Sequence, residues 1–291
     1  EFAPRWRASA GGHGCGNNGV SCRTGLTAPE HPNTRTARAA PLFARARYAG
    51  AVPNDTSDLT SELLRAPLDA ADLRPRVQAT IDDVLARQGT LLANVSPDME
   101  PLVSALRDLL AGAKRLRPAF AYWGWRGASA DVTLGSTEES AVVQAVTGLE
   151  FLQACALIHD DVMDGSPTRR GTPTVWARYI ERHQAGGWNG EDRRFGDAAA
   201  ILVGDIAMVM ADRQMGSVDE ATRSVWDRLR TELNFGQYLD VVGTAKGDVT
   251  ADMARTIVAN KTAGYTIVRP LQLGAAMAGS PELGDALAAH G

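Results

Sequence analysis

The stretch from Thr137 to Gly171 reads TEESAVVQAVTGLEFLQACALIHDDVMDGSPTRRG. Up to Met163 its apolar residues recur at three- and four-residue spacing, which predicts one long helix capped by Thr137 and opened by two glutamates. The helix is apolar nearly all round, so we expect it to lie at the centre of a helical bundle. Charged residues follow at its C-terminal end, namely Asp160, Asp161, Asp164, Arg169 and Arg170.

The same spacing recurs on both sides of this stretch. It predicts further helices over residues 61–92, 98–125, 196–215, 218–242 and 251–277. Breaks rich in glycine separate these segments, and no stretch shows the alternation of a strand. The sequence therefore predicts an all-α domain built as a bundle of long helices.

Residues 1–50 differ in composition from the rest of the chain. They hold seven arginines, no lysine and two acidic residues, and they show no helical or strand period. We expect disorder here, with residues 1–56 as a leader and residues 57–291 as the folded domain. Three origins for the leader stay open: a cloning-derived segment, an organelle transit peptide or a natural tail. Its histidines and cysteines lack the spacing of zinc ligands.

The composition is that of a globular protein, with 44% hydrophobic residues and a formal net charge of -4. This acidic balance argues against nucleic acid as a partner. The most apolar run, residues 141–158, is interrupted by Gln144, Glu150 and Gln153, so we expect no transmembrane segment. Three cysteines without framework spacing, and no secretory signal, indicate a reduced, cytoplasmic protein.

The aspartates at the end of the long helix are arranged for joint action. At about 100° per residue, Asp160 and Asp164 lie about 40° apart on one face, with Asp161 beside them and Gln153 two turns below Asp160. Carboxylates at a helix C-terminus repel one another and oppose the helix dipole, so a cation must compensate. Hard oxygen ligands of this kind suit Mg²⁺. The alternative is a solvated acidic helix end.

Two basic clusters indicate phosphate binding. Arg169 and Arg170 offer rigid forks of donors that match phosphate, although a salt bridge to the aspartates is the alternative. In GAKRLRP, Lys114 and Arg117 would share a helix face, with Pro118 kinking or ending that helix. The alternative there is a basic helix C-terminus, which the dipole alone favours.

Two further pairs are weak signals when taken alone. They are Lys261 with Thr262, and Gln237 with Asp240, which share a helix face. In this order, however, KRLRP, HDDVMDGSPTRRGTPT, GDIAM, GQYLD and KT resemble the signatures of the trans-prenyl diphosphate synthases, or polyprenyl synthetases. The resemblance covers residues 109–276. It implies an isoprenoid-synthase fold, an all-α bundle around a central cavity, and a homodimer.

The resemblance also implies roles for the acidic cluster and its partners. Asp160 and Asp164, with Asp161, resemble the first aspartate-rich motif, which holds Mg²⁺ against an allylic diphosphate. Arg169 resembles a contact to that same diphosphate. Together with Lys261, these residues are the expected catalytic set.

The remaining candidates would bind substrate. Lys114, Arg117, Gln153 and Arg170 resemble the isopentenyl diphosphate site. The resemblance implies that Lys261 and Thr262 reach the allylic diphosphate and the nascent carbocation. It places Gln237 and Asp240 on a helix face that supports the cavity and the metal. The implied reaction ionises the allylic diphosphate, and the double bond of isopentenyl diphosphate then attacks the cation.

Product length is expected to depend on the helix face below Asp160. In the family, bulky aromatic residues four and five positions before the first aspartate stop growth early. Here these positions hold the small residues Ala156 and Cys155, and Leu152 and Leu149 follow one and two turns lower. We therefore expect a product longer than farnesyl diphosphate, most simply geranylgeranyl diphosphate.

One family feature is missing. The second aspartate-rich motif does not occur before Gly291, so we expect a sequence that is incomplete at its C-terminus. A class I terpene cyclase shares the fold but needs no isopentenyl diphosphate site, against which Lys114, Arg117 and Arg170 count. A non-catalytic partner subunit of a heteromeric synthase is the second alternative.

Overall fold

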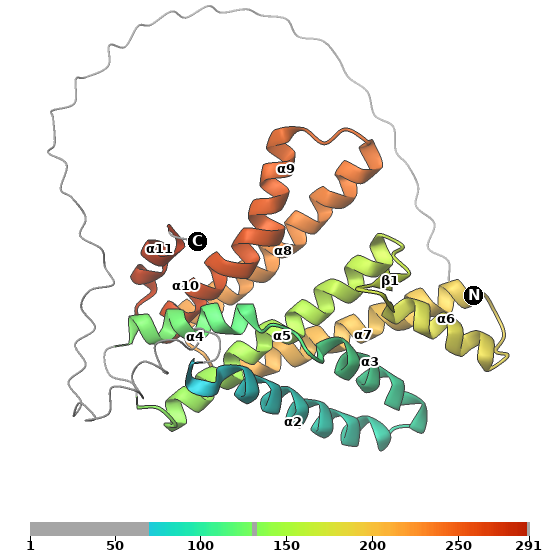
Figure 1. Cartoon of the computed structure of the whole chain (residues 1–291), viewed down its shortest axis with the longest axis horizontal. Helices are drawn as coiled ribbons and strands as arrows, with labels where there is room; N and C mark the ends of the chain where they lie inside the picture. Colours follow the sequence, from blue (N-terminus) through green and yellow to red (C-terminus); the bar gives the residue numbers. More distant parts are fainter. Residues whose placement is uncertain (1–69, 130–132, 290–291) are drawn as a thin grey trace, which may run out of the picture. The chain divides into compact units, whose positions relative to one another are not determined.

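The structure, a computed structural model, describes residues 70–129 and 133–289, all within the unit formed by residues 54–291. The predicted leader and the start of the predicted helix at 61–92 lie outside these described residues. Nearly all the described regular structure is helical, which confirms the all-α prediction (Figure 1). The helices are α2 (Leu73–Ala93), α3 (Glu100–Leu110), α4 (Leu116–Ala128), α5 (Thr137–Met163), α6 (Val175–Ala185), α7 (Asp192–Met215), α8 (Glu220–Lys246), α9 (Ala251–Ile257), η4 (Val258–Val268), α10 (Arg269–Met277) and α11 (Pro281–Ala288).

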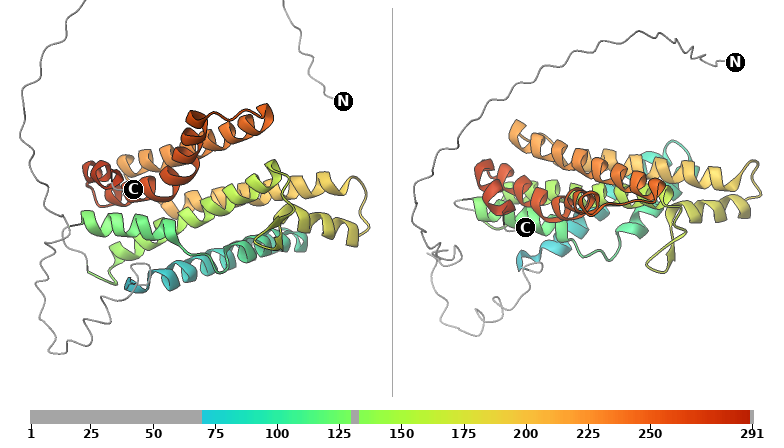
Figure 2. Two further views of the ribbon diagram at one scale, coloured as in Figure 1. Left: turned by 45° about the horizontal axis from the view of Figure 1, so that its top comes forward. Right: turned by 90° about the horizontal axis from the view of Figure 1, so that it is seen from above.

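Helix α5 is the central element, with the bounds that the sequence predicts. Its N-terminal cap is Ser136 rather than Thr137, because the Ser136 hydroxyl accepts the backbone N–H of Glu139 at 3.1 Å. α5 packs along α7 and also contacts α2, α3, α4 and α6 (Figure 2). Gly148 permits the close approach to α7, since a Cβ there would lie 2.8 Å from the carbonyl oxygen of Ala211.

The predicted helix over residues 98–125 is wrong in its middle. The chain leaves α3 at Leu110, turns through a loop in which Arg115 has a φ of 58°, and enters α4 at Leu116. Pro118 lies in the first turn of α4, where a helix has no use for the missing N–H. It therefore begins a helix instead of ending one, and Lys114 lies on a loop rather than on a shared face with Arg117.

The last predicted helix, over residues 251–277, is continuous but not uniform. Its middle part, η4, has π-helical hydrogen bonding between two α-helical parts, α9 and α10. Wide turns of this kind are rare and often occur at functional sites. The turn contains Lys261, one of the candidate site residues.

Two short features escaped the sequence analysis between Gly165 and Gly190. A minimal hairpin pairs β1 (Thr168–Arg169) with β2 (Thr172–Pro173), and α6 follows it. α6 buries a stripe that recurs at helical spacing, Val175, Trp176, Tyr179 and His183, so a periodic signal was present but short. Aromatic contacts among Tyr179, His183, Trp188 and Phe195 hold α6 against the start of α7.

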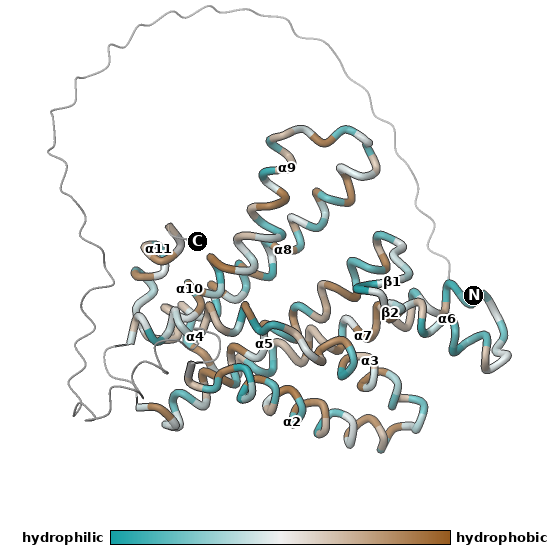
Figure 3. The backbone as a smooth tube through the Cα atoms, in the orientation of Figure 1, coloured by the Kyte–Doolittle hydropathy of each residue, from teal (hydrophilic) through white to brown (hydrophobic). Residues whose placement is uncertain are grey.

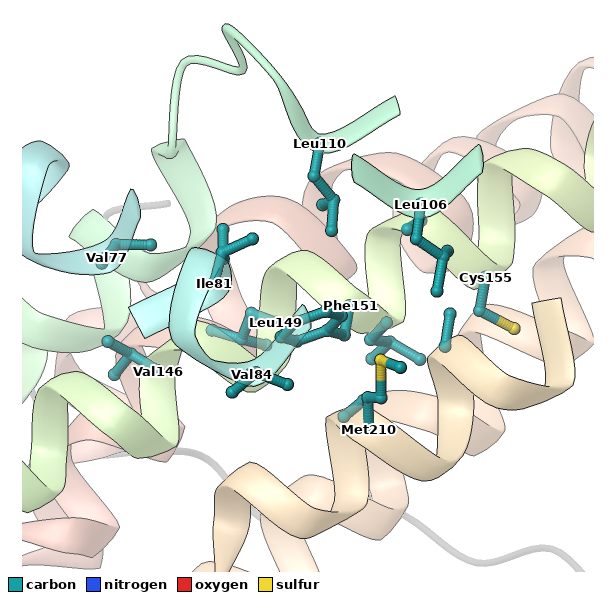
Figure 4. Close-up of a cluster of buried hydrophobic side chains, with 14 of the residues drawn as sticks. Val77, Ile81, Val84, Leu106, Leu110, Val146, Leu149, Phe151, Cys155 and Met210 are labelled. Atoms are coloured by element: carbon teal, nitrogen blue, oxygen red, sulfur yellow. The ribbon is translucent and has the colours of Figure 1, made fainter. Parts of the chain in front are cut away.

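Apolar side chains from α2, α3, α5 and α7 form one core cluster (Figure 4). Apolar and polar residues mix along most of the helices (Figure 3). The expectation that no run could span a membrane was wrong by length and composition, because α5 is long and apolar enough. However, 72% of its most apolar stretch is buried inside the bundle, the pattern of a core helix.

Candidate functional site

The three aspartates lie where α5 ends, and their environments differ. Asp161 is 4% exposed, and its backbone oxygen accepts the indole N–H of Trp176 at 3.0 Å, which fixes α6 to this corner. Asp164 is the C-terminal cap of α5 and is exposed. Burial, and then the neighbouring Asp160, raise the pKa of Asp164 above its usual value. The described residues form no salt bridge with the Asp164 carboxylate, in contrast to those of Asp160 and Asp161.

Arg169 compensates the other two aspartates. Its Nε lies 3.0 Å from both carboxylate oxygens of Asp161, and its Nη2 lies 2.8 Å from Asp161 and 3.2 Å from Asp160. The hydrogen bonds to Asp161 are the main reason that the pKa of this guanidinium is raised. In the protein without substrate, Arg169 thus forms salt bridges to the aspartates, which the sequence analysis had given as the alternative to phosphate binding.

Asp160 also draws in residues from α8 and η4. Lys261 Nζ lies 2.9 Å from Asp160 Oδ1 and 2.7 Å from Asp240 Oδ2, and Gln237 Nε2 donates to Asp160 Oδ1 at 2.9 Å. Burial lowers the pKa of Lys261, but the hydrogen bonds to Asp240 and Asp160 outweigh it and the pKa is raised. Residues from three separate sequence motifs therefore meet at Asp160. The acidic cluster consists of Asp160, Asp161 and Asp164, the residues that contact them, which are Arg169, Gln237 and Lys261, and Asp240, which pairs with Lys261.

A mainly apolar cavity of about 270 Å³ lies against this cluster, and we call it the apolar cavity. Leu152, Cys155 and Ala156 line it as predicted, but Leu149 does not. Leu149 is fully buried among core side chains, because the neighbouring helices close over α5 at that depth. Sequence reasoning missed His159 on α5 itself and the walls from the other helices, which are Asp205 and Met208 of α7, Leu233 and Asn234 of α8, and Tyr265 of η4.

A second cavity, of about 620 Å³, lies beyond Asp161, and we call it the basic cavity. The predicted residues Lys114, Arg117, Gln153 and Arg170 all line it. Lys114 and Arg170 are exposed and make no hydrogen bond or ion pair with any residue that the structure describes. Arg170 adopts a φ of 53°, a strained conformation for a non-glycine residue that is often found at functional sites. Two unpaired cations are therefore free to meet an anion.

Arg117 stands between the two cavities. Its guanidinium lies 4.4 Å from the ring centroid of Tyr265 and donates to Thr266 Oγ1 at 3.1 Å. Arg117, Gln153 and Leu157 line both cavities, which therefore adjoin at these residues. Thr262, by contrast, is exposed and lines neither cavity.

Two further residues could have been nominated from the sequence. Tyr265 follows Lys261 by four residues, a spacing that places both on one side of a helix. Arg178 follows Arg170 by eight residues and lines the basic cavity, where it pairs with Asp108 at 2.7 Å. Tyr265 ends the stretch NKTAGY that contains Lys261 and Thr262, but sequence reasoning gave it no role, and Arg178 belongs to no motif that it had used.

The acidic cluster fits a divalent cation that is shared with phosphate. Among the described residues no group of three or more carboxylate, imidazole or thiol ligands forms a complete metal site. Asp160 and Asp164 offer two carboxylates one turn apart, and a bound cation would relieve the repulsion between them, which after burial is the next cause of the raised pKa of Asp164. Mg²⁺ commonly takes one or two carboxylates from the protein and the rest of its ligands from water and substrate phosphate.

The fold and the site together define an all-α isoprenoid-synthase bundle with an acidic cluster beside two adjoining cavities. The sequence matches the family model described as polyprenyl synthetase over residues 99–290. The chain belongs to this family.

Individual relatives agree with this assignment. The geranylgeranyl diphosphate synthase of Mycobacterium tuberculosis is 31% identical over 76% of this chain and 56% of its own length. The (2E,6E)-farnesyl diphosphate synthase of the same organism is 32% identical over 61% of this chain and 44% of its own length. A crystal structure of geranylgeranyl pyrophosphate synthase from Corynebacterium glutamicum, complexed with isoprenyl diphosphate and magnesium, is 38% identical with a TM-score of 0.70, covering 76% of this chain and 64% of that one. The chain spans about half the length of the curated relatives it matches.

Proposed function

We propose that this protein is a prenyltransferase that condenses isopentenyl diphosphate with an allylic diphosphate to make a longer trans-prenyl diphosphate. One observation carries the proposal. The apolar cavity, with its acidic cluster, adjoins a basic cavity that holds unpaired cations, and the two meet at Arg117, Gln153 and Leu157. Two diphosphates bound on either side of this junction would bring their hydrocarbon ends together.

In the proposed mechanism, the allylic diphosphate lies at the acidic cluster with its tail in the apolar cavity. Asp160 and Asp164 would hold Mg²⁺, with Asp161 supporting them through Arg169. Mg²⁺ bound there supplies positive charge that stabilises the leaving diphosphate. Lys261 and Arg169, which contact Asp160 in the free protein, transfer their hydrogen bonds to the diphosphate as negative charge develops on it.

The second substrate occupies the basic cavity. Lys114, Arg117, Gln153 and Arg170 hold the diphosphate of isopentenyl diphosphate, which directs its double bond toward the junction. The allylic C–O bond breaks with its electron pair leaving on diphosphate, the double bond attacks the allylic cation, and a proton is lost. The apolar walls exclude water, which would otherwise capture the cation.

We propose geranylgeranyl diphosphate as the product. Cys155 and Ala156 leave room for the growing tail below Asp160, while Met208 and Leu233 narrow the cavity from α7 and α8. Relatives include farnesyl, geranylgeranyl, geranylfarnesyl and octaprenyl diphosphate synthases, so the comparisons support a range of lengths.

The two alternatives are less well supported. A terpene cyclase has no use for a second anion site, whereas the basic cavity offers Lys114 and Arg170 for one. One relative is named component 2 of a heptaprenyl diphosphate synthase. A non-catalytic partner subunit, however, would not need the aspartates of the first motif, the arginines and Lys261 that meet here.

We further propose that the protein works as a homodimer in the cytoplasm. Leu202 and Val209 are 57% and 60% exposed and share one face of α7, because residues seven apart lie close in direction on a helix. Such an exposed apolar stripe would be covered by a second copy. The thiol of Cys155, buried and not in a disulfide, suits a reducing compartment.

The test is to incubate the chain with labelled isopentenyl diphosphate, MgCl₂ and each of dimethylallyl, geranyl and farnesyl diphosphate. We expect a labelled product with at least one allylic partner, and none from the Arg170→Met variant at the same substrate concentrations. Calorimetric titration with isopentenyl diphosphate alone gives a readout that does not depend on turnover. Absence of both product and binding would overturn the proposal.

A further inference from the structure

Arg115 lines the basic cavity and is the buried cation among those that the structure places there, whereas the others are exposed or half-buried. It is 3% exposed, and, like Arg170, it has a backbone φ in the left-handed region that non-glycine residues rarely adopt, here 58°. Lys114 precedes it directly, and Arg117 follows in the first turn of α4. The conformation of Arg115 therefore sets the direction in which both neighbours leave the loop.

The side chain of Arg115 holds this conformation by contacts to three helices. Nη1 donates to Glu150 on α5, and Nη2 donates to Gln78 on α2 and to the backbone oxygen of Leu110 at 2.6 Å. Both terminal nitrogens are thus occupied, and the side chain is only 2% exposed. A bound diphosphate could recruit Arg115 only by breaking these contacts.

Glu150 links the same contact to the substrate site. It is 4% exposed and lies one turn before Gln153 on α5, and Gln153 lines both cavities. The Arg115–Glu150 pair therefore fastens the loop that carries Lys114 to the helix that carries Gln153. A buried ion pair seldom stabilises a fold more than apolar residues of similar size would, so its value here lies in geometry.

We propose that Arg115 and Glu150 are positioning residues that hold Lys114 and Arg117 toward the diphosphate of isopentenyl diphosphate without contacting it themselves. This inference rests on the proposed function of the basic cavity. It predicts that loss of the pair weakens binding in the basic cavity and leaves the acidic cluster unaffected.

The experiment replaces the whole pair, so that no buried charge is left alone. The double variant Arg115→Met/Glu150→Met is compared with Arg269→Met/Glu232→Met, which removes a partly buried ion pair that lines neither cavity. Each protein is melted, titrated with isopentenyl diphosphate, and titrated with dimethylallyl diphosphate in MgCl₂. Hydrogen exchange of the loop from Ala111 to Leu116 is followed in parallel.

We expect the double variant to melt close to the wild type and to bind isopentenyl diphosphate on the order of tenfold more weakly, as when one charge-assisted contact is misplaced. Binding of dimethylallyl diphosphate should not change, and exchange in the loop should accelerate. The control pair should change neither affinity. Should the double variant fail to fold, Arg115→Lys replaces it. This variant keeps a positive charge opposite Glu150 but loses the two-pronged guanidinium group. We then expect a smaller loss of affinity, confined to isopentenyl diphosphate.

Wild-type affinity for isopentenyl diphosphate in the folded Arg115 variants, or losses in them that are equal for both substrates, would overturn the positioning role. Failure of the wild-type chain to bind isopentenyl diphosphate would overturn the proposed function and this inference with it. That outcome is recognised in the first titration, before any variant is compared.

Discussion

Lys261 and Asp160 are 101 residues apart in the chain, yet Lys261 Nζ lies 2.9 Å from Asp160 Oδ1. The same ammonium group lies 2.7 Å from Asp240 Oδ2. In the protein without substrate, one lysine thus joins α5, α8 and η4. It offsets the negative charge of the two carboxylates, part of which Mg²⁺ would neutralise in the proposed function. The Lys261 ammonium group therefore stands beside Asp160 as a cation in the protein without Mg²⁺.

The Lys261→Met variant should therefore be less stable without metal. We expect a loss of roughly 1–2 kcal/mol, because charge-assisted hydrogen bonds to two carboxylates disappear. Thermal melts with and without MgCl₂ test this, and MgCl₂ should raise the melting temperature of the variant more than that of the wild type. Lys246→Met, an exposed change in the last turn of α8, is the control. Equal responses of both variants to MgCl₂ would contradict the prediction.

Asp160→Asn and Asp164→Asn should separate in their effects on the free protein. Asp160→Asn removes the negative charge and one of the two carboxylate oxygens that accept hydrogen bonds from Lys261, Arg169 and Gln237, and it should lower stability. Asp164→Asn relieves repulsion and should not. Both should abolish any metal-dependent turnover. Melting curves paired with kinetics decide this, and equal destabilisation by the two changes would refute it.

The raised pKa of Asp164 also has a pH signature. Because the native state binds this proton more tightly than the unfolded state, the contribution of Asp164 to stability is present below its unfolded pKa and is lost as pH rises through the folded value. The difference in unfolding free energy between wild type and Asp164→Asn should therefore move in favour of the variant as pH rises. Denaturant titrations at pH values from below the unfolded pKa of Asp164 to above its folded pKa measure this difference in unfolding free energy. A difference that does not change with pH would exclude the effect.

Glu139 gives the opposite pH dependence. Burial alone would raise its pKa, but hydrogen bonds from Arg76, Tyr122 and the backbone of Gly135 lower it to about 2. Its contribution is complete above the unfolded pKa and is lost as pH falls toward about 2. Glu139→Gln should cost about 1–3 kcal/mol at neutral pH and flatten the acid limb of the stability curve. Glu138→Gln, which is exposed, should do neither.

Product length should respond to Ala156 and not to Leu149. Ala156→Phe fills the apolar cavity and should shorten the product without abolishing turnover. Leu149→Ala empties a core position and should cost about 2–5 kcal/mol while leaving product length unchanged. Chromatography of the products, with melts of each variant, checks both halves. A shorter or longer product from Leu149→Ala would mean that the residues that limit product length lie deeper than the walls of the apolar cavity.

If the protein is a homodimer through α7, a charge placed on the exposed face of α7 should lower the molecular mass of the protein in solution. Leu202→Glu places a charge on the exposed apolar stripe and should shift the protein toward monomer in light scattering coupled to size exclusion. Val95→Glu, at a 70% exposed position before α3, is the matched control. A wild-type protein that is already monomeric would overturn the proposal.

Local patterns in the chain were enough to predict several parts of this protein. The bounds of α5, the alignment of Asp160 with Asp164 and the small residues Cys155 and Ala156 all follow from helical spacing, because residues three and four apart share a face wherever the helix is placed. The family motifs likewise nominated the residues of the acidic cluster and the basic cavity. Each of these signals lies within a few residues of chain.

Packing supplied the rest, since it brings together residues that no local spacing relates. Helical geometry places Leu149 below Asp160 on the same stripe as Ala156, but neighbouring helices bury Leu149 in the core and leave Ala156 on the cavity wall. The partners of Asp160 come from α8 and η4, and the turn at Arg115 depends on contacts to three helices. A helix pattern predicts the directions in which side chains point, whereas the neighbours that they meet depend on how distant segments exclude water together.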